Sequence, residues 1–288
     1  MNRQDRKEDL KNKITKYGKE LATLTDKAKF SEEMQNYFNF VSKFYKYSWH
    51  NRILIYSQCP NASLISGFNT WKNQFERNVK KGSSAIWIYA PRFIKENVEI
   101  LEKDGVKEIE EIKHIYFVPV PVFDLSQTDG KPIPEIDYGS DTNKHSELLK
   151  QMETGLTKDE ITLLYKPMGK LDYGYTDGKL LAINSKKSDD DKLRTIFHEY
   201  AHFKLHWDKD RGTYTKKQKE TEAEATAFII CRFLKIDTKA YNYLALYNSD
   251  SELILNSLQR ISKAVSGIMK HFNGEIKEEN KQVINVTC

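Results

Sequence analysis

Cysteine is scarce in this chain of 288 residues, which contains only Cys59, Cys231 and Cys288. The three lie far apart, and none belongs to a Cys-x-x-Cys pair. An odd number of isolated cysteines excludes a disulfide framework and a thiolate zinc site. It also predicts a reducing, cytoplasmic environment.

Long apolar runs are also missing. No apolar stretch approaches 18 residues, and no apolar leader follows Met1. We therefore expect no transmembrane segment, no secretory leader and no membrane partner. A chain of this length is expected to form two domains of modest size, each with its own hydrophobic core.

Acidic residues are rare in one segment, although the net charge of the whole chain is only +5. Residues 41–95 contain nine basic residues and a single acid, Glu76, whereas residues 96–111 are acidic. A local excess of positive charge is typical of a surface that binds a polyanion. An ordinary solvated face would also explain it.

The N-terminal part combines helical and strand-like patterns. Apolar residues recur at helical spacing in residues 3–26, and Ser31 is a suitable N-cap for a second helix. We then expect a short strand, a short helix and two strands of a hairpin with its tip near Gly105, at residues 62–65, 69–75, 85–90 and 112–123. These elements predict an α+β fold with N-terminal helices and a small antiparallel sheet.

In residues 128–144 the composition changes to Asp, Gly, Pro, Ser and Lys, with little apolar content. We therefore predict a linker at 129–144 that joins a first domain, 1–128, to a second, 145–288. The second domain is expected to be mostly helical with a short β-sheet. Its predicted strands are 161–165 and 179–183, and its helices begin near Ser188 and span 216–234 and 249–272.

The strongest motif is His-Glu-x-x-His at His198, Glu199 and His202. On a helix, His198 and His202 lie on one face, so both imidazoles can bind one Zn²⁺. Glu199 lies beside them and can take a proton from a water that the metal activates. An exposed helix with two ordinary histidines does not explain the apolar flanks, which predict burial: Ile196, Phe197, Phe203 and Leu205.

A catalytic zinc usually has three protein ligands, and the same segment does not offer the third. Asp208 would require the helix to turn back at Leu205, which is a good helix former. His206 lies about 12 Å along the axis from His198, so it is expected to support the site or to be a polar helix end.

The next helix offers three acids, Glu220, Glu222 and Glu224. Glu220 and Glu224 share a face, and Glu222 lies opposite. Glu224 adjoins the apolar part of the helix and is our predicted third ligand, because an inward carboxylate needs a partner. Glu220 would then orient a ligand histidine, and Glu222 suits a solvated helix start.

At these motifs the sequence resembles a known family. Residues 197–202, 222–228 and 236–238 resemble the gluzincin-like metallopeptidase domain of ImmA/IrrE-type and ArdC-like proteins. The resemblance implies that the third zinc ligand is the residue at the position of Glu224.

The N-terminal part resembles the ArdC-type single-stranded-DNA-binding domain in an ordered series of motifs: 47–54, 68–71, 79–82 and 122–128. One departure is that Ser83 and Ser84 replace the usual Glu-Lys, which removes one cation.

Single-strand binding combines a cationic groove with aromatic faces on which bases stack, each stack contributing about 1–3 kcal/mol. Most aromatic residues of the basic segment should lie in the core, whereas Trp49 and Trp71, with their polar neighbours, are expected to be exposed. The predicted DNA-binding residues are Trp49, Asn51, Arg52, Trp71, Lys72, Lys80 and Lys81.

These inferences predict a DNA-associated zinc endopeptidase with a single-stranded-DNA-binding module and a protein substrate. The substrate would lie along the strand at 178–184. The oxyanion would be stabilised by a histidine or by one of Tyr200, Tyr214, Tyr241 and Tyr243. The resemblance implies a role on a mobile element, such as antirestriction or cleavage of a DNA-bound regulator. The alternative is a single-stranded-DNA-binding protein that acts by occupancy and has a structural or vestigial zinc site.

Overall fold

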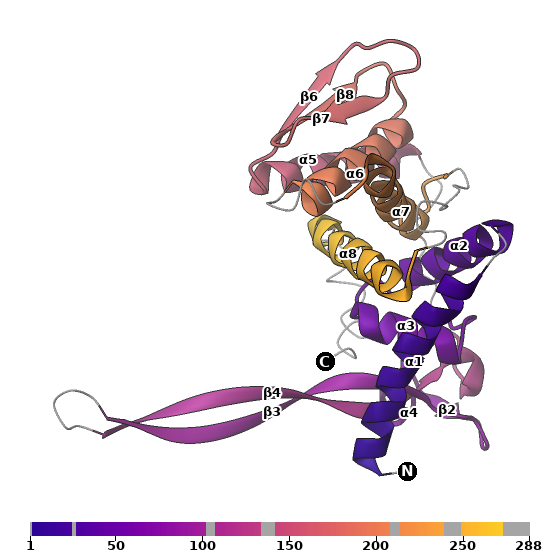
Figure 1. Ribbon diagram of the computed structural model, residues 1–288, viewed down its shortest axis with the longest axis vertical. Helices are drawn as coiled ribbons and strands as arrows, with labels where there is room; N and C mark the ends of the chain where they lie inside the picture. The colour runs from indigo at the N-terminus through magenta and orange to yellow at the C-terminus, as the bar shows by residue number, and fades with distance from the viewer. Residues whose placement is uncertain are drawn as a thin grey trace.

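The structure is a computed structural model that describes residues 2–24, 27–101, 107–133, 142–207, 214–238 and 249–272. Three N-terminal helices lead into a long β-hairpin, and a second group of helices with a small sheet follows (Figure 1). The architecture is α+β, as the sequence predicted. No helix in the described part of the chain is long and apolar enough to cross a membrane.

The N-terminal helices are α1 (Arg3–Thr23), α2 (Lys27–Lys43) and α3 (Trp49–Gln58). The side chain of Ser48 caps α3 by accepting a hydrogen bond from the backbone N–H of Asn51. The second helix begins four residues before the predicted cap, Ser31, which therefore lies inside α2.

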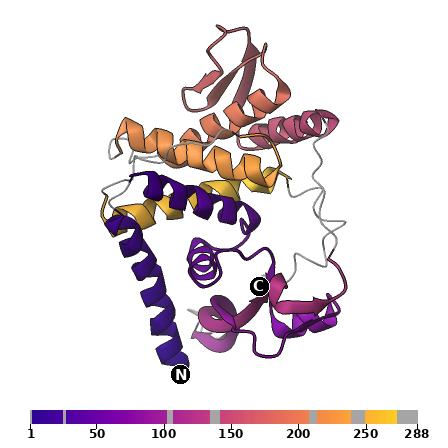
Figure 2. The ribbon, with the colours of Figure 1, turned by 90° about the vertical axis from the view of Figure 1, so that its right-hand side faces the viewer.

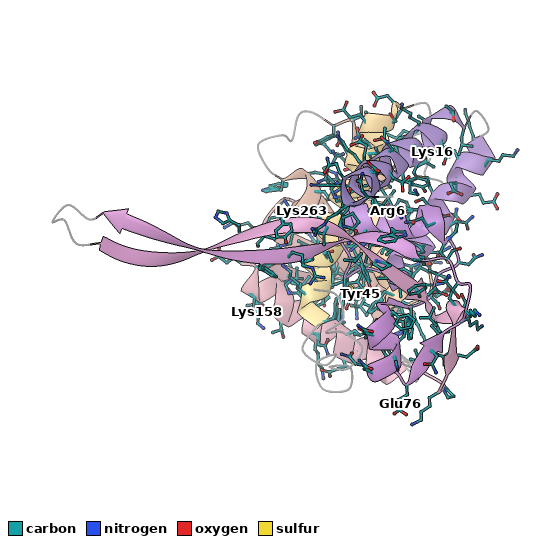
Figure 3. All side chains as sticks on the ribbon, turned by 90° about the horizontal axis from the view of Figure 1, so that it is seen from below. Arg6, Lys16, Tyr45, Glu76, Lys158 and Lys263 are labelled. Atoms are coloured by element: carbon teal, nitrogen blue, oxygen red, sulfur yellow. The ribbon has the colours of Figure 1, made fainter. Side chains whose placement is uncertain are left out.

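The first sheet has the strand order β1 (Ile65–Ser66), β4 (Lys107–Asp124), β3 (Ile86–Leu101). The hairpin of β3 and β4 is paired from Ile86↔Val122 to Leu101↔Lys107, so its strands are much longer than predicted. It projects as an arm away from the helices (Figure 3). Two short elements complete this region: α4 (Phe68–Asn73) and β2 (Arg77–Val79).

The segment that we predicted to be a linker has regular structure at both ends. Strand β5 (Thr128–Gly130) pairs with β2, and helix α5 (Thr142–Lys158) begins before the expected second domain. Residues 134–141 lie outside the described part, so the domain boundaries stay predictions.

The second half contains a three-stranded sheet in the order β6 (Thr162–Lys166), β8 (Leu180–Asn184), β7 (Gly174–Thr176). Two predicted strands are confirmed, and β7 was missed. The predicted helices are also present as α6 (Asp189–His206), α7 (Lys216–Phe233) and α8 (Ser251–Met269), the last continued by a short 3₁₀ turn.

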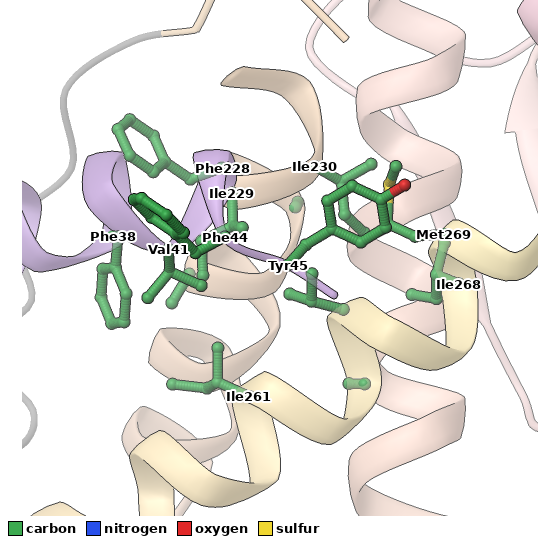
Figure 4. Packing of buried hydrophobic residues seen from close by; sticks show 14 of the residues in the cluster. Phe38, Val41, Phe44, Tyr45, Phe228, Ile229, Ile230, Ile261, Ile268 and Met269 are labelled. Atoms are coloured by element: carbon green, nitrogen blue, oxygen red, sulfur yellow. The ribbon is translucent and has the colours of Figure 1, made fainter. Parts of the chain in front are cut away.

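Both halves share one hydrophobic core, contrary to the expectation of two separate cores. Helix α7 packs against α2, and α8 packs against α1 and α3 (Figure 2). Tyr45, in the turn that follows α2, contacts Phe233 of α7 with ring centroids 4.5 Å apart. Figure 4 shows side chains from both halves interdigitating there, including Phe44, Phe228 and Ile261. The N-terminal helices therefore complete their packing with α7 and α8 of the second half.

Candidate metal centre and nucleic-acid interface

Helix α6 places the His-Glu-x-x-His motif at the centre of the second half. Ser188 caps the helix by accepting from the backbone N–H of Asp191, and three acids in the first turn favour the positive end of the helix dipole. Leu193, Ile196 and Phe197 are buried on its apolar side. The predicted buried helix is confirmed.

Three metal-binding atoms converge between α6 and α7. The Nε2 atoms of His198 and His202 lie 3.1 Å apart, and Oε2 of Glu220 lies 3.4 and 3.5 Å from them. Two imidazole nitrogens and a carboxylate oxygen within 4.8 Å of one another form a donor set that suits zinc. Helix α7 approaches α6 closely because small residues line its buried side: Ala223, Ala225 and Ala227.

Glu224 occupies a different place from the one predicted. Its Oε2 lies 2.9 Å from Nδ1 of His198, the ring nitrogen outside the converging set. Glu220, and not Glu224, therefore lies with the two Nε2 atoms in this structure, and the assignment of the third ligand stays a prediction. Both residues lie on the same face of α7, one turn apart, and the earlier turn is the one level with both Nε2 atoms.

The converging charges shift the ionisation of these groups. Burial lowers the pKa of His198, but hydrogen bonds to Glu220 and Glu224 outweigh burial and raise it to about 10. Hydrogen bonds from His198 and His202 lower the pKa of Glu220. Burial raises the pKa of the Glu199 carboxyl, although both histidines oppose that shift.

Glu199 lines a cavity of about 310 Å³ beside the metal donors. The other lining residues come from α6 itself, from α7 and from the start of β7: Tyr173, Gly174, Arg194, Thr195, His198 and Glu224. Gly174 allows β7 to pack closely against its neighbours here, because a Cβ there would lie 2.7 Å from the carbonyl oxygen of Ala182 and 2.8 Å from the methyl carbon of Thr195. The sequence analysis missed Arg194, although its spacing of four from His198 places it on the ligand face of α6.

The strand at 178–184 is not an edge, contrary to the prediction. It forms β8, which pairs with β6 on one side and β7 on the other. The strand that borders the cavity is β7, and within the described chain it pairs only with β8. Within the described chain, the edge of this sheet nearest the cavity is therefore that of β7.

Of the tyrosines proposed for oxyanion stabilisation, Tyr200 and Tyr214 do not line the cavity. Tyr200 is fully buried and donates to the carboxylate of Asp159. Tyr214 accepts a hydrogen bond from Arg260. Tyr241 and Tyr243, like the alternative ligand Asp208, lie outside the described residues. Tyr173 and Arg194 line the cavity and carry hydrogen-bond donors that suit an oxyanion.

The prediction that Glu222 is solvated is also wrong, because its side chain is fully buried. It accepts hydrogen bonds from His206 and from Ser257 and Arg260 of α8. Helix periodicity separated Glu222 from the other two acids correctly, but α8 covers the face on which it lies.

Three of the predicted DNA-binding residues have buried structural roles. Arg52 is fully buried and donates to the carbonyl oxygens of Phe44 and Tyr45 and to hydroxyls on α8. Asn51 both donates to and accepts from the backbone of Tyr89. Trp71 is fully buried and donates through Nε1 to the carbonyl oxygen of Phe123. Arg52 and Trp71 therefore present no accessible surface to DNA in this conformation, whereas Asn51 lines the groove described below.

The other predicted DNA-binding residues are accessible. Lys72, Lys80 and Lys81 are exposed, and Trp49 is partly buried beside His50. Lys80 donates to the carbonyl oxygen of Ser126, so one of the three lysines is already tied to the neighbouring chain.

A groove of about 450 Å³ lies between α3, α4 and the base of the hairpin. Lys46, Arg92 and Phe117 are among its lining residues, and Lys46 and Arg92 are exposed. Phe117 is 56% exposed, and the hairpin register places it on the same face as Phe93 and Ile115, which are 61% and 59% exposed. The sequence analysis assigned Ile115 and Phe117 to a strand, ended the other strand before Phe93, and missed the exposure of all three residues.

The fold and the donor set together define the class of a metallopeptidase-like domain attached to an α+β module. Residues 158–265 match the family model of the IrrE N-terminal-like domain, Peptidase_M78. Residues 4–123 match the model of the N-terminal domain of the anti-restriction factor ArdC. The chain is therefore an ArdC-like protein that contains both domains, which confirms the resemblance.

An uncharacterized protein of Bacillus anthracis is 26% identical over 304 residues, which cover 90% of this chain. The chain spans about half the length of that relative, 51%. Two crystal structures of the antirestriction protein ArdC from plasmid R388 are also similar, one metal-free and one with Mn(II). Each shares 15% identity with this chain. They cover 78% and 79% of this chain and 85% and 86% of their own chains, with TM-scores of 0.46 and 0.47.

Proposed function

We propose that this protein is a zinc-dependent endopeptidase that acts in association with single-stranded DNA. The observation that carries the proposal is the convergence of His198 Nε2, His202 Nε2 and Glu220 Oε2 beside Glu199 and an open cavity. A structural zinc usually has four protein ligands. The described residues bring three donors together, which supports a catalytic site over the alternative of a structural one.

His198, His202 and Glu220 would hold the zinc ion. A zinc ion bound there supplies Lewis-acid chemistry, which activates water and polarises a carbonyl group. Glu199 would take the proton from the attacking water and pass it to the leaving amine. The substrate backbone would add to the free edge of β7, and Tyr173 or Arg194 would donate to the developing oxyanion.

The DNA-binding proposal rests on the ArdC-type domain and on the groove at the base of the hairpin. Lys46 and Arg92 supply positive charge, and Phe117 supplies an exposed aromatic face, which together meet the requirements for sequence-tolerant single-strand binding. The additional candidates for contact with DNA are Lys72, Lys80, Lys81 and Trp49. A role in antirestriction would follow if the protein protects incoming DNA, and cleavage of a DNA-bound regulator is the second possibility.

The experiment is a comparison of the full-length protein with Glu199→Gln. Each is loaded with zinc and incubated with casein and with its own metal-free form, with and without oligothymidine. The wild-type protein should cleave at least one of these substrates and Glu199→Gln should cleave neither. Equal cleavage by both proteins would exclude Glu199 as the base.

A further inference from the structure

Glu222, His206 and Arg260 form a polar cluster on the far side of His202, and the hydrolytic mechanism does not use it. Glu222 is fully buried, and His206 is 4% exposed. A buried carboxylate is costly unless hydrogen-bond donors surround it. Glu222 has such donors: Ser257 Oγ at 2.7 Å, Gln218 Nε2 at 3.4 Å, Arg260 Nε at 3.2 Å and a second nitrogen of Arg260.

The cluster reaches the metal donors through two imidazole contacts. Oε2 of Glu222 lies 3.0 Å from Nε2 of His206, and Nδ1 of His206 lies 3.3 Å from Nδ1 of His202. Because Nε2 of His202 is the atom that belongs to the converging set, the cluster touches only the opposite nitrogen of that ring.

The hydrogen-bond partners assign the direction of each bond. An ionised carboxylate only accepts, so Nε2 of His206 carries a hydrogen and donates to Glu222. A neutral His206 then has a lone pair on Nδ1, and the hydrogen between the two rings belongs to Nδ1 of His202. This tautomer leaves the lone pair of His202 on Nε2, where a metal ion needs it.

We propose that His206 and Glu222 are positioning residues that hold His202 in its metal-binding tautomer and orientation. The proposal rests on the metal centre described above. It gives the two ligand histidines equivalent support, because Glu224 contacts Nδ1 of His198 directly and Glu222 reaches Nδ1 of His202 through His206. Supporting groups of this kind change metal affinity by about 10- to 100-fold.

Glu222→Gln tests the direction of the hydrogen bonds with almost no change of shape. Three donors, from Ser257, Gln218 and Arg260, meet Oε1 of Glu222, whereas Oε2 meets Nε2 of His206 and Nε of Arg260, so the amide oxygen should take the position with more donors. The amide NH₂ then faces Nε2 of His206 and reverses the chain of hydrogen bonds, which places the hydrogen of His202 on Nε2. Zinc affinity should fall although the side chain has the same size.

His206→Leu and His206→Gln form a second comparison. Leucine removes both contacts, whereas the glutamine amide can accept from His202 and donate to Glu222, so it should restore part of the affinity. His145→Leu is the matched control. His145 is another buried histidine, bonded to Asp190 at the opposite end of α6, and its loss should lower stability without changing zinc affinity.

The measurement is zinc affinity of the full-length protein, obtained by competition with a chromophoric chelator, together with the d–d absorption of the Co²⁺-loaded form. We expect a 10- to 100-fold loss of zinc affinity for His206→Leu and Glu222→Gln and a smaller loss for His206→Gln. The Co²⁺ absorption should shift in the same order.

If His206→Leu does not fold, the zinc affinity of the Glu222→Gln protein tests the positioning role. Zinc affinity within twofold of wild type in the folded variants would overturn the positioning role while leaving the metal centre intact. A wild-type protein that binds no zinc would instead overturn the metal centre, and the positioning role with it.

Discussion

Nδ1 of His198 lies 2.9 Å from Oε2 of Glu224. This contact distinguishes Glu224 from Glu220, the other acid on the same face of α7. A carboxylate on Nδ1 orients the ring and directs the lone pair of Nε2 toward the metal. Glu220 lies near the Nε2 atoms of both histidines instead. One acid therefore fits the role of a ligand, and the other fits the role of a support.

Glu199→Gln should keep the zinc and lose hydrolysis. The amide cannot accept a proton from water, so we expect cleavage to fall by about 10²- to 10⁴-fold. Zinc content by mass spectrometry and cleavage of casein measure the two properties separately. Loss of zinc together with activity would mean that Glu199 holds the site together.

Phe117→Ala should weaken binding of oligothymidine by about 5- to 150-fold, the equivalent of one lost base stack. Fluorescence anisotropy with the full chain measures this loss. Leu171→Ala is the control, because Leu171 is 88% exposed on the other half of the molecule. Unchanged binding in Phe117→Ala would move the interface away from the groove.

Lys46→Gln and Arg92→Gln test the charge of the same groove. Each phosphate contact contributes about 0.7 to the slope of log affinity against log salt for single strands. The double variant should reduce that slope by about 1.4. The triple variant Lys72→Gln, Lys80→Gln, Lys81→Gln is the comparison. A larger change in slope in the triple variant would place the main path of the DNA at α4 and at the turn that follows β2.

Arg52→Met should destabilise the fold by about 3 kcal/mol or more, because it leaves buried carbonyl and hydroxyl groups without donors. Denaturant unfolding measures the change in the free energy of unfolding. Lys72→Met is the exposed control and should change stability by less than about 0.5 kcal/mol. A stable Arg52→Met protein that fails to bind DNA would return Arg52 to the DNA interface.

Local patterns in the sequence were enough to predict α6, α7, α8 and the hairpin. The periodicity of four placed His198 and His202 together, and no distant residue was needed for that inference. The choice between Glu220 and Glu224 depends on how far along its axis α7 meets α6, and helix periodicity alone carries no such information.

Long-range packing explains the other errors. Arg52 donates a hydrogen bond to Ser262, which lies 210 positions later in the sequence. Ser262 belongs to α8, a helix that we did not expect to pack against the first domain. Trp71 is buried because its indole reaches the carbonyl oxygen of Phe123 on a strand more than 50 residues away. Helix α5 was missed because its first residues share the polar composition of the preceding segment.

The most direct test of the proposed metal centre compares zinc affinity in Glu220→Ala and Glu224→Ala, measured on the full-length proteins by chelator competition. The two glutamates lie one turn apart on the same helix, so each variant controls for the other. Glu220→Ala should lose stoichiometric zinc, and Glu224→Ala should keep one zinc with affinity lowered by about 10- to 100-fold. The reverse result, with zinc lost in Glu224→Ala and retained in Glu220→Ala, would contradict the ligand set His198, His202 and Glu220.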